Sequence, residues 1–155
     1  MKQIFAAAVS LALLGTPAVH AQGIQITPNG STPTSQGPEA NFTGQVFVDS
    51  VTPAIDNPPT ASGIVSFPPG GRTAWHSHPA GQMLVILSGQ GWVQEESQPR
   101  KEMKPGDLVW IPAGIKHWHG ATATNAMRHL AVSFNRDGKN TDWFEKVTDG
   151  PYRVN

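Results

Sequence analysis

Cysteine is absent from the 155-residue sequence, so neither a disulfide framework nor a thiolate metal site can form. Charge is also scarce: 14% of the residues are charged, with 11 basic and 11 acidic side chains and no basic cluster. This balance argues against a nucleic-acid partner or an anionic membrane surface. After residue 21 no segment shows a long apolar repeat of 3.6 residues, which argues against a helical domain.

Residues 1–21 have the pattern of a secretory signal peptide. Lys2 supplies a positive charge, residues 4–14 form an apolar run too short to span a bilayer, and small residues suit cleavage before Gln22. A buried N-terminal helix is the alternative. The pattern favours export to the periplasm or the medium, with no membrane attachment after cleavage.

The rest of the sequence predicts one all-β domain. It contains most of the 14 prolines and 16 glycines, placed between short runs of Val, Ile, Phe and Trp. Residues 22–40 are expected to form a flexible arm, and residues 41–155 a small closed barrel or jelly roll. The expected strands are Phe42–Val48, Ala61–Phe67, Arg72–His78, Met83–Leu87, Gly91–Glu95, Asp107–Ile111, Lys116–His119 and Met127–Phe134. A short helical turn is expected over Asp142–Val147.

The run Met83–Leu87 is apolar on both faces of its expected strand. One face fills the barrel interior, so something must cover the other. A homodimer or homotetramer accounts for this most simply. The alternative is that the N-terminal arm covers that face.

Two histidines, His76 and His78, lie two residues apart, so their side chains leave the same face of a strand. The turn predicted at residues 79–81 would return the chain antiparallel and bring Gln82 beside them. Two imidazoles and a carboxamide placed in this way indicate a metal site.

A second His-x-His pair, His117 and His119, follows another Pro-Ala-Gly turn. A single buried histidine is usually a hydrogen-bonded core residue, and that is the alternative here. Clustering favours metal binding, because every histidine outside the signal segment lies in or just after the two blocks. These five are His76, His78, His117, His119 and His129.

The spacing resembles that of the cupin superfamily, whose first motif reads G-x5-H-x-H-x3,4-E-x6-G and whose second reads G-x5-P-x-G-x2-H-x3-N. The first is matched by Gly70, His76, His78, Gln82 and Gly89, and the second by Gly106, Pro112, Gly114 and His117. Gln82 stands where glutamate is usual, and Ala121 where asparagine is usual. The resemblance implies a single-domain cupin barrel, a double-stranded β-helix or jelly roll, that binds a metal. It does not imply one reaction, since cupins host many.

Longer runs resemble the bacterial manganese-dependent cupin hydroxynitrile lyases. They are Arg-Thr-Ala-Trp-His-x-His-Pro-x-Gly-Gln, Lys-His-Trp-His-Gly-Ala, Met-x-His-Leu-Ala around His129, and the tail Asp142–Asp149. By this resemblance the metal ligands are His76, His78, Gln82 and His117. His119 and His129 would project into the same cavity, which would be lined by Gly63, Val65, Thr73 and Ser133.

Three neutral imidazoles and a neutral carboxamide leave the charge of a divalent cation uncompensated, which favours Lewis-acid chemistry over redox cycling. Such N/O ligation suits Mn(II), the metal implied by the resemblance, and also Fe, Zn, Ni or Co. A lyase acting on an α-hydroxynitrile such as mandelonitrile must remove the hydroxyl proton and release cyanide. We assign His129 as general base and His119 as proton donor to cyanide, with the reverse assignment left open. Support of the metal ligands is the alternative role for both.

Other functions fit the same motifs. A metal cupin could be a dioxygenase, an isomerase or a sugar-acid processing enzyme acting on a small molecule. It could also hold a metal or ligand without turnover. The sequence places a hydroxynitrile lyase-like activity first among these, on the resemblance alone.

Overall fold

The computed structural model describes residues 23–53, 55 and 58–152, which form 13 strands and one helix. The structure is thus nearly all-β, as predicted. The strands are β1 (Thr34–Gln36), β2 (Phe42–Thr43), β3 (Phe47–Ser50), β4 (Thr60–Phe67), β5 (Arg72–Thr73), β6 (His76–Ser77), β7 (Gln82–Gly89), β8 (Gly91–Glu95), β9 (Lys101–Met103), β10 (Leu108–Ile111), β11 (His117–Ala121), β12 (Met127–Phe134) and β13 (Asp142–Trp143), and the helix is α1 (Asp149–Tyr152).

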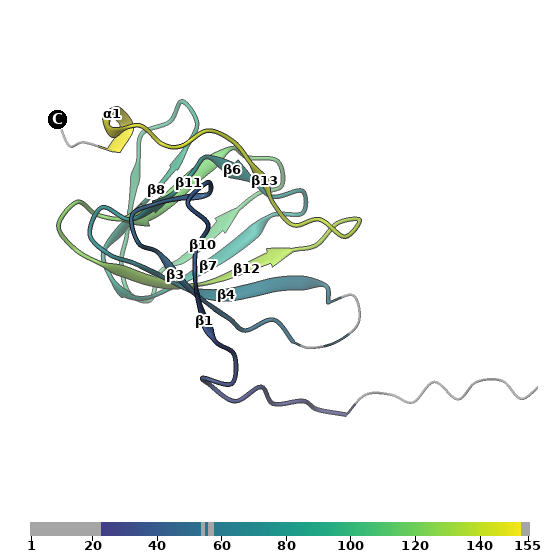
Figure 1. The fold of residues 1–155 in the computed structure, drawn as a ribbon. Coiled ribbons are helices and arrows are strands. Elements are labelled where there is room, and N and C mark those ends of the chain that lie inside the picture. Colours follow the sequence, from purple (N-terminus) through teal and green to yellow (C-terminus); the bar gives the residue numbers. More distant parts are fainter. Residues whose placement is uncertain (1–22, 54, 56–57, 153–155) are drawn as a thin grey trace, which may run out of the picture.

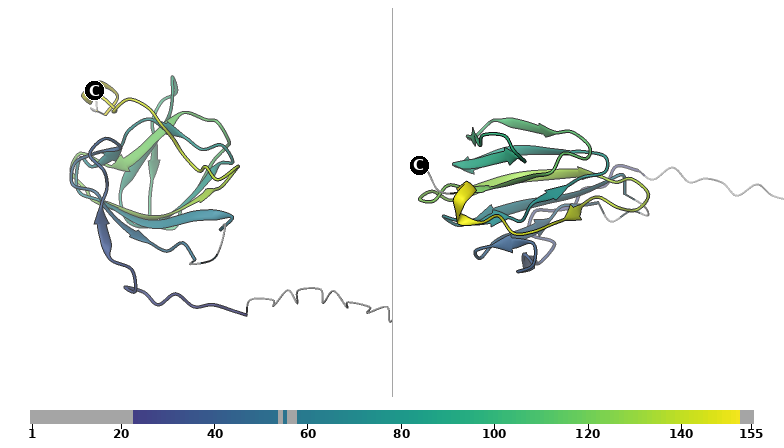
Figure 2. Two further views of the ribbon diagram at one scale, coloured as in Figure 1. Left: turned by 45° about the vertical axis from the view of Figure 1, so that its right-hand side comes forward. Right: turned by 90° about the horizontal axis from the view of Figure 1, so that it is seen from above.

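Two antiparallel sheets face each other around a common interior (Figures 1 and 2). The first sheet has the order β1-β3-β4-β12-β7-β10. In the second, β11 is central, with β5 and β6 along one edge and β8, which continues to β9, along the other. The left view of Figure 2 looks into the barrel that the two curved sheets enclose.

Two expected strands are each divided in the structure. The stretch expected over 42–48 becomes β2 and β3, which belong to different sheets. Gly44 lies between them with φ of 81°, a left-handed conformation that breaks a strand and that glycine adopts readily. The stretch expected over 72–78 becomes β5 and β6, which share one edge of β11.

The break between β5 and β6 has a consequence for the interior. Arg72 pairs with Gly120 and His76 pairs with His117. Between these two pairs, three residues on one side (73–75) therefore lie opposite two on the other (118–119). One extra residue of this kind is a bulge, and it shifts the alternation of side chains. Thr73 and His76, three residues apart, therefore both line the interior cavity, which a regular strand would not allow.

The interior is apolar at one end and polar at the other. In β7, the inward residues change along the strand from Gln82 to Leu84 and Ile86, all buried. Ten buried side chains form the hydrophobic core, and each large, fully buried one contributes about 1.5–3 kcal/mol through the hydrophobic effect, while Phe42, Val65 and Phe67 among them also line the cavity with the histidines. The ten are Phe42, Val46, Val65, Phe67, Leu84, Ile86, Met103, Ile111, Ala121 and Met127. The histidines therefore project from strands fixed by an ordinary hydrophobic core.

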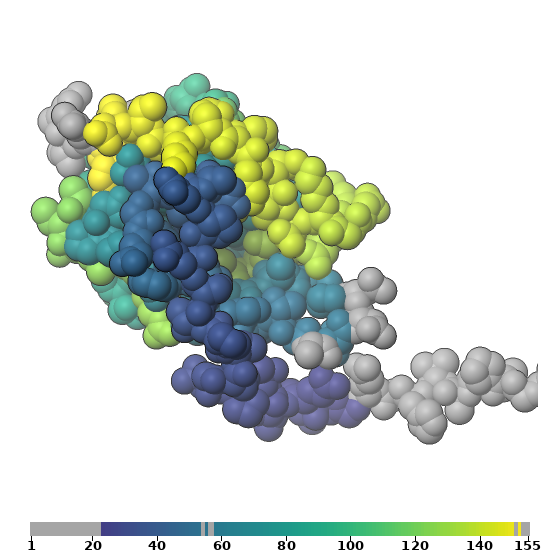
Figure 3. All heavy atoms as spheres, viewed as in Figure 1, coloured from purple at the N-terminus to yellow at the C-terminus, as the bar shows by residue number. Residues whose placement is uncertain are grey.

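The C-terminal segment covers the outer face of β11. Trp118 points away from the interior and is fully buried against Val147 and Tyr152, so it serves as a packing residue. Arg72 donates to the Val147 carbonyl oxygen and lies over the Tyr152 ring at 4.3 Å, which holds the segment in place. In Figure 3 this yellow segment crosses one face of the molecule beside the blue N-terminal strands.

The helical turn expected over Asp142–Val147 is wrong. Asp142 and Trp143 instead form β13, which pairs with β6, and the only helix among the described residues begins at Asp149. The backbone of this segment finds its partners in the sheet, since Phe144 N–H donates to the Trp75 carbonyl oxygen at 2.9 Å. Tertiary pairing overrides the weak local preference for a turn.

The predicted signal segment, residues 1–21, lies outside the described residues. Within the expected arm, β1 pairs with β3, while residues 23–33 are exposed. No helix in the described part of the chain is both long enough and apolar enough to cross a bilayer.

Candidate metal centre and active-site cavity

A tight turn places Gln82 beside the first histidine pair. Gly81 N–H donates to the His78 carbonyl oxygen, and Gly81 has φ of 86°. A Cβ at this position would lie 2.9 Å from the Trp110 ring and 3.0 Å from the Ile111 carbonyl oxygen, so only glycine fits. The turn predicted at 79–81 is thereby confirmed, and β7 begins at Gln82.

Three histidines have the same hydrogen-bond pattern. The Nδ1–H groups of His76, His78 and His117 donate to backbone carbonyl oxygens, at 2.9, 2.6 and 2.9 Å respectively. Because a carbonyl can only accept, each of these rings carries its proton on Nδ1, and Nε2 keeps its lone pair. Fixing the tautomer in this way is what protein metal sites do for their imidazole ligands.

Gln82 has a complementary arrangement. Its amide nitrogen Nε2 donates to the Ser133 hydroxyl at 3.0 Å. Its oxygen Oε1 is buried without a hydrogen-bond partner among the described residues, and so are Nε2 of His78 and Nε2 of His117. Buried polar atoms are rarely left without a partner, and three such lone pairs on neutral donors are suited to bind a cation. The predicted donor set therefore fits a divalent metal.

Three histidines in the described residues have ring nitrogens close enough to one another to share a metal ion. They are His76, His117 and His119, each offering a nitrogen within 4.8 Å of the others. His78 lies outside this group, although its ring centroid is 5.1 Å from that of His76 and 5.5 Å from that of His117. The structure thus brings together all five predicted histidines, with His76 and His117 common to both possible ligand sets.

His119 and His129 form a pair of a different kind. His129 Nε2 and His119 Nδ1 are 3.2 Å apart, so one ring donates its proton to the other. His119 Nε2 and His129 Nδ1 have no hydrogen-bond partner among the described residues. No backbone carbonyl fixes the tautomer of His119, so the pair can hold its shared proton in either direction.

The histidines are neutral at physiological pH. Burial lowers the pKa of His117 to about 4 and that of His129 to about 4, from a usual value of 6.5. Burial, and then repulsion by His117, holds the pKa of His76 well below its usual value. Burial and the neighbouring His129 do the same to His119, and burial also lowers the pKa of His78. Neutral imidazoles are the form that binds metals and accepts protons.

A cavity of about 290 Å³ opens onto the histidines. It lies between the two sheets and is lined by Gly63, Val65, Thr73 and Ser133, as the sequence resemblance implied. The complete lining is Phe42, Val48, Ser50, Thr52, Ala61, Ser62, Gly63, Val65, Phe67, Thr73, His76, His78, Gln82, His119, His129, Ala131, Ser133, Thr141 and Trp143. Every one of these side chains is neutral once the histidines are, which restricts the chemistry of any substrate.

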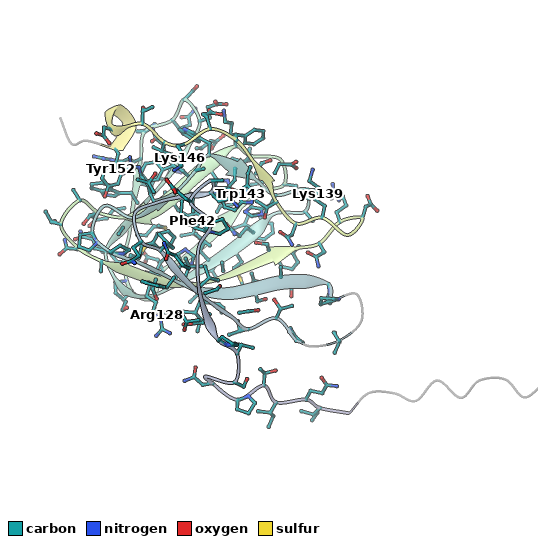
Figure 4. The ribbon with its side chains drawn as sticks, in the orientation of Figure 1. Phe42, Arg128, Lys139, Trp143, Lys146 and Tyr152 are labelled. Carbon is teal, nitrogen blue, oxygen red and sulfur yellow. The ribbon has the colours of Figure 1, made fainter. Side chains whose placement is uncertain are left out.

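The C-terminal segment contributes residues that the sequence did not single out. Trp143 lies opposite His76 across the β13–β6 pair, with its ring centroid 4.7 Å from that of His76 and 5.7 Å from that of Phe42. Figure 4 shows Trp143 and Phe42 close together. The carbonyl that orients His78 belongs to Asn140 of the same segment. Only pairing across more than 60 residues creates these contacts, and no local pattern signals them.

A barrel of two antiparallel sheets with inward-facing histidine pairs is typical of cupins. The chain belongs to the cupin superfamily: the cupin-domain family model matches residues 63–133. It is 49% identical over 124 residues to a protein named (R)-mandelonitrile lyase from Granulicella tundricola, in an alignment that covers 80% of this chain and 95% of the relative. It is therefore a hydroxynitrile lyase-like cupin, and the resemblance inferred from the sequence is confirmed.

Two other relatives bear on the fold and the class. A cupin-like protein from Thermotoga maritima superposes with a TM-score of 0.73 at 38% identity, covering 77% of this chain and 90% of that protein. A shorter match of 57 residues, 35% identical, joins the chain to a dimethylsulfoniopropionate lyase from Ruegeria pomeroyi, covering 37% of this chain and 28% of the relative. The sequence relatives named for an activity are thus both lyases.

Proposed function

We propose that the protein is a metal-dependent lyase that cleaves or forms α-hydroxynitriles, with mandelonitrile as the type of substrate. The relative named (R)-mandelonitrile lyase, which aligns over nearly its whole length, supports the reaction. The observation that carries the proposal is the set of buried, neutral donor atoms of His78, Gln82 and His117 without protein partners, beside a cavity lined only by neutral side chains.

His76, His78, Gln82 and His117 would hold the metal, with Mn(II) as the first candidate. The unpartnered donor atoms and the fixed Nδ1–H tautomers support this set. Nitrogen and oxygen donors would equally accept Fe, Zn, Ni or Co. When bound, a divalent cation would supply Lewis acidity that makes a nearby substrate hydroxyl a stronger acid.

The neutral cavity supports a neutral substrate. The described lining includes no lysine or arginine, so away from the proposed metal no side chain would compensate the charge of a carboxylate such as that of a sugar acid. An α-hydroxynitrile carries no charge. Phe42, Phe67 and Trp143 give the cavity aromatic walls that suit an aryl substituent.

The histidine pair would move the protons. His129, buried and neutral, would accept the hydroxyl proton of the substrate, because the described lining offers no carboxylate base. The C–O bond then gains double-bond character, the C–C bond to the nitrile carbon breaks, and its electron pair leaves with cyanide. His119 would give cyanide its proton. The contact between the two rings lets a proton pass from His129 to His119 and close the cycle.

The test is cleavage of mandelonitrile by the manganese-loaded protein. We expect cyanide and benzaldehyde in equal amounts, and no product from protein treated with a chelator. Oxygen consumption by the iron(II)-loaded protein, without cyanide release from mandelonitrile, would contradict the proposal and favour a dioxygenase. Tight binding of benzaldehyde with no turnover under any metal would favour a binding role.

We further infer export and self-association. Export follows from the pattern of residues 1–21. Association as a homodimer or homotetramer is supported by apolar side chains at the edge of the first sheet, where Leu108 is 63% and Trp110 53% exposed. Light scattering on the purified protein tests association, and N-terminal sequencing of exported protein tests the cleavage before Gln22.

A further inference from the structure

Ser133 lies against one of the proposed metal ligands. It is paired with Gln82 across β12 and β7, and both side chains are buried. Its hydroxyl accepts a hydrogen bond of 3.0 Å from the Gln82 amide nitrogen. The Gln82 side chain also faces His78, whose pKa burial lowers and Gln82 partly raises again, but its oxygen Oε1 makes no hydrogen bond with the described residues.

The nitrogen and the oxygen of the Gln82 amide therefore differ in their hydrogen bonds. The nitrogen has an acceptor in Ser133, whereas the buried oxygen Oε1 has no protein partner. An amide can be turned by half a revolution at little cost in shape, so its hydrogen bonds decide which end faces which neighbour. An amide nitrogen has no lone pair for a cation, so only one of the two orientations makes Gln82 a ligand.

We propose that Ser133 is a positioning residue of the metal site, which accepts the Gln82 amide proton and so presents Oε1 as a metal ligand. This inference rests on the metal site proposed above. A hydroxyl can also donate, but with the amide oxygen directed at a cation Ser133 must accept. Its own proton then remains available, and the described residues provide no acceptor for it.

Loss of the Ser133 oxygen should weaken metal binding without removing a ligand. The buried amide N–H would lack an acceptor, and the amide would either turn or bind the metal with that group unsatisfied. Groups that orient a metal ligand typically contribute 10- to 100-fold to affinity. We expect about a tenfold effect, because one of four ligands is involved.

The matched pair Ser133→Thr and Ser133→Val tests this role. Both side chains are branched at Cβ and similar in size, and only threonine keeps the hydroxyl. The Mn(II) dissociation constant is measured from the electron paramagnetic resonance signal of free Mn(II), without substrate. We expect Ser133→Thr to bind within about threefold of the parent, and Ser133→Val about tenfold more weakly than Ser133→Thr. Equal affinities of the two variants would overturn the proposal.

The same pair in a Gln82→Ala background separates a specific role from a general one. If Ser133 acts through Gln82, the difference between threonine and valine disappears when the amide is absent. A difference that persists would contradict the proposal and point to a direct effect of cavity polarity. The metal affinities are measured well below the thermal midpoint of each variant in chelator, because the unsatisfied amide N–H lowers the stability of Ser133→Val and unfolding must not be mistaken for weaker binding.

This metal-binding test of Ser133 does not depend on the reaction that the protein catalyses. A protein that shows the threonine–valine difference but cleaves no hydroxynitrile would support the role of Ser133 and contradict the proposed activity. A parent protein that binds no divalent metal would overturn this inference together with the metal site.

Discussion

The five clustered histidines divide into two groups that differ in their hydrogen bonds, and four of the five line one cavity, while His117 packs against His76. His76, His78 and His117 each donate from Nδ1 to a backbone carbonyl. His119 and His129 instead contact each other at 3.2 Å. All five are buried and have lowered pKa values, so burial alone does not separate them.

The two groups of histidines differ in whether the position of the ring proton is fixed. A ring tied to a backbone carbonyl has a fixed tautomer and a permanent lone pair on Nε2, which suits a metal ligand. A ring paired with another ring can give or take the proton between them, which suits acid–base chemistry. We therefore propose that the neighbours of these histidines give identical side chains different roles.

The largest difference between the two groups is expected when one histidine of each is replaced and metal binding is compared. We expect His78→Ala to lower Mn(II) affinity by at least about 100-fold, because loss of a ligand should exceed loss of its support. His119→Ala should retain the metal. Elemental analysis of the dialysed variants measures this. The opposite result would show that the metal is held by His76, His117 and His119, the group whose ring nitrogens all lie within 4.8 Å of one another.

The second comparison concerns turnover. His129→Ala should keep its full metal content and lower kcat for mandelonitrile cleavage by about 10²- to 10⁴-fold, the usual contribution of a general base. Cyanide release under saturating substrate measures kcat. Loss of both metal and turnover would contradict the division of roles, and unchanged kcat would remove His129 from the reaction.

The lowered pKa values of His117 and His129 predict a pH-dependent stability of the metal-free protein. Each group titrates at about 4 when folded and near 6.5 when unfolded, so the unfolded chain binds more protons between these values. Stability should be full above about pH 6.5 and fall as the pH drops toward 4. We expect the Tm in chelator to fall by at least ~5 °C between pH 7 and pH 4.5.

A His129→Gln variant provides the control for that experiment. Because it lacks one of the two groups, its Tm should fall less steeply over the same pH range. An equal fall in both proteins would show that other groups dominate the acid response.

The smallest effect on activity is expected from substitution of Trp143, which packs against His76 and lines the cavity. Trp143→Ala should raise KM for mandelonitrile by about threefold to tenfold, the value of one aromatic contact, and change KM less for an aliphatic hydroxynitrile. Trp143→Phe, which keeps an aromatic wall, is the matched control. Equal changes for both substrates would show that Trp143 supports His76 and does not contact the substrate.

Much of the fold and the site could be predicted from local patterns. The His-x-His pairs and the turn before Gln82 are local signals, and the structure brings these residues together: His76, His78, Gln82 and His119 line one cavity, and His117 packs against His76. Two errors share a physical cause: the division of the strand expected over 72–78 and the helical turn expected over 142–147 both depend on pairing with distant strands.

The remaining features require three-dimensional contacts. The Asn140 carbonyl that fixes His78, and the Ser133 hydroxyl that receives the Gln82 amide, are separated from their partners by 62 and 51 residues. Neither residue type predicts such a role on its own. Every residue has a backbone carbonyl, so the sequence cannot indicate which one orients His78.

The most direct test of the central claim is an anomalous difference map, recorded at the manganese absorption edge, from crystals of the manganese-loaded protein. We predict one peak at bonding distance, about 2–2.3 Å, from Nε2 of three histidines and Oε1 of Gln82, the histidines being His76, His78 and His117. A peak bound by His119 with Gln82 detached, or no peak in the cavity, would contradict the account.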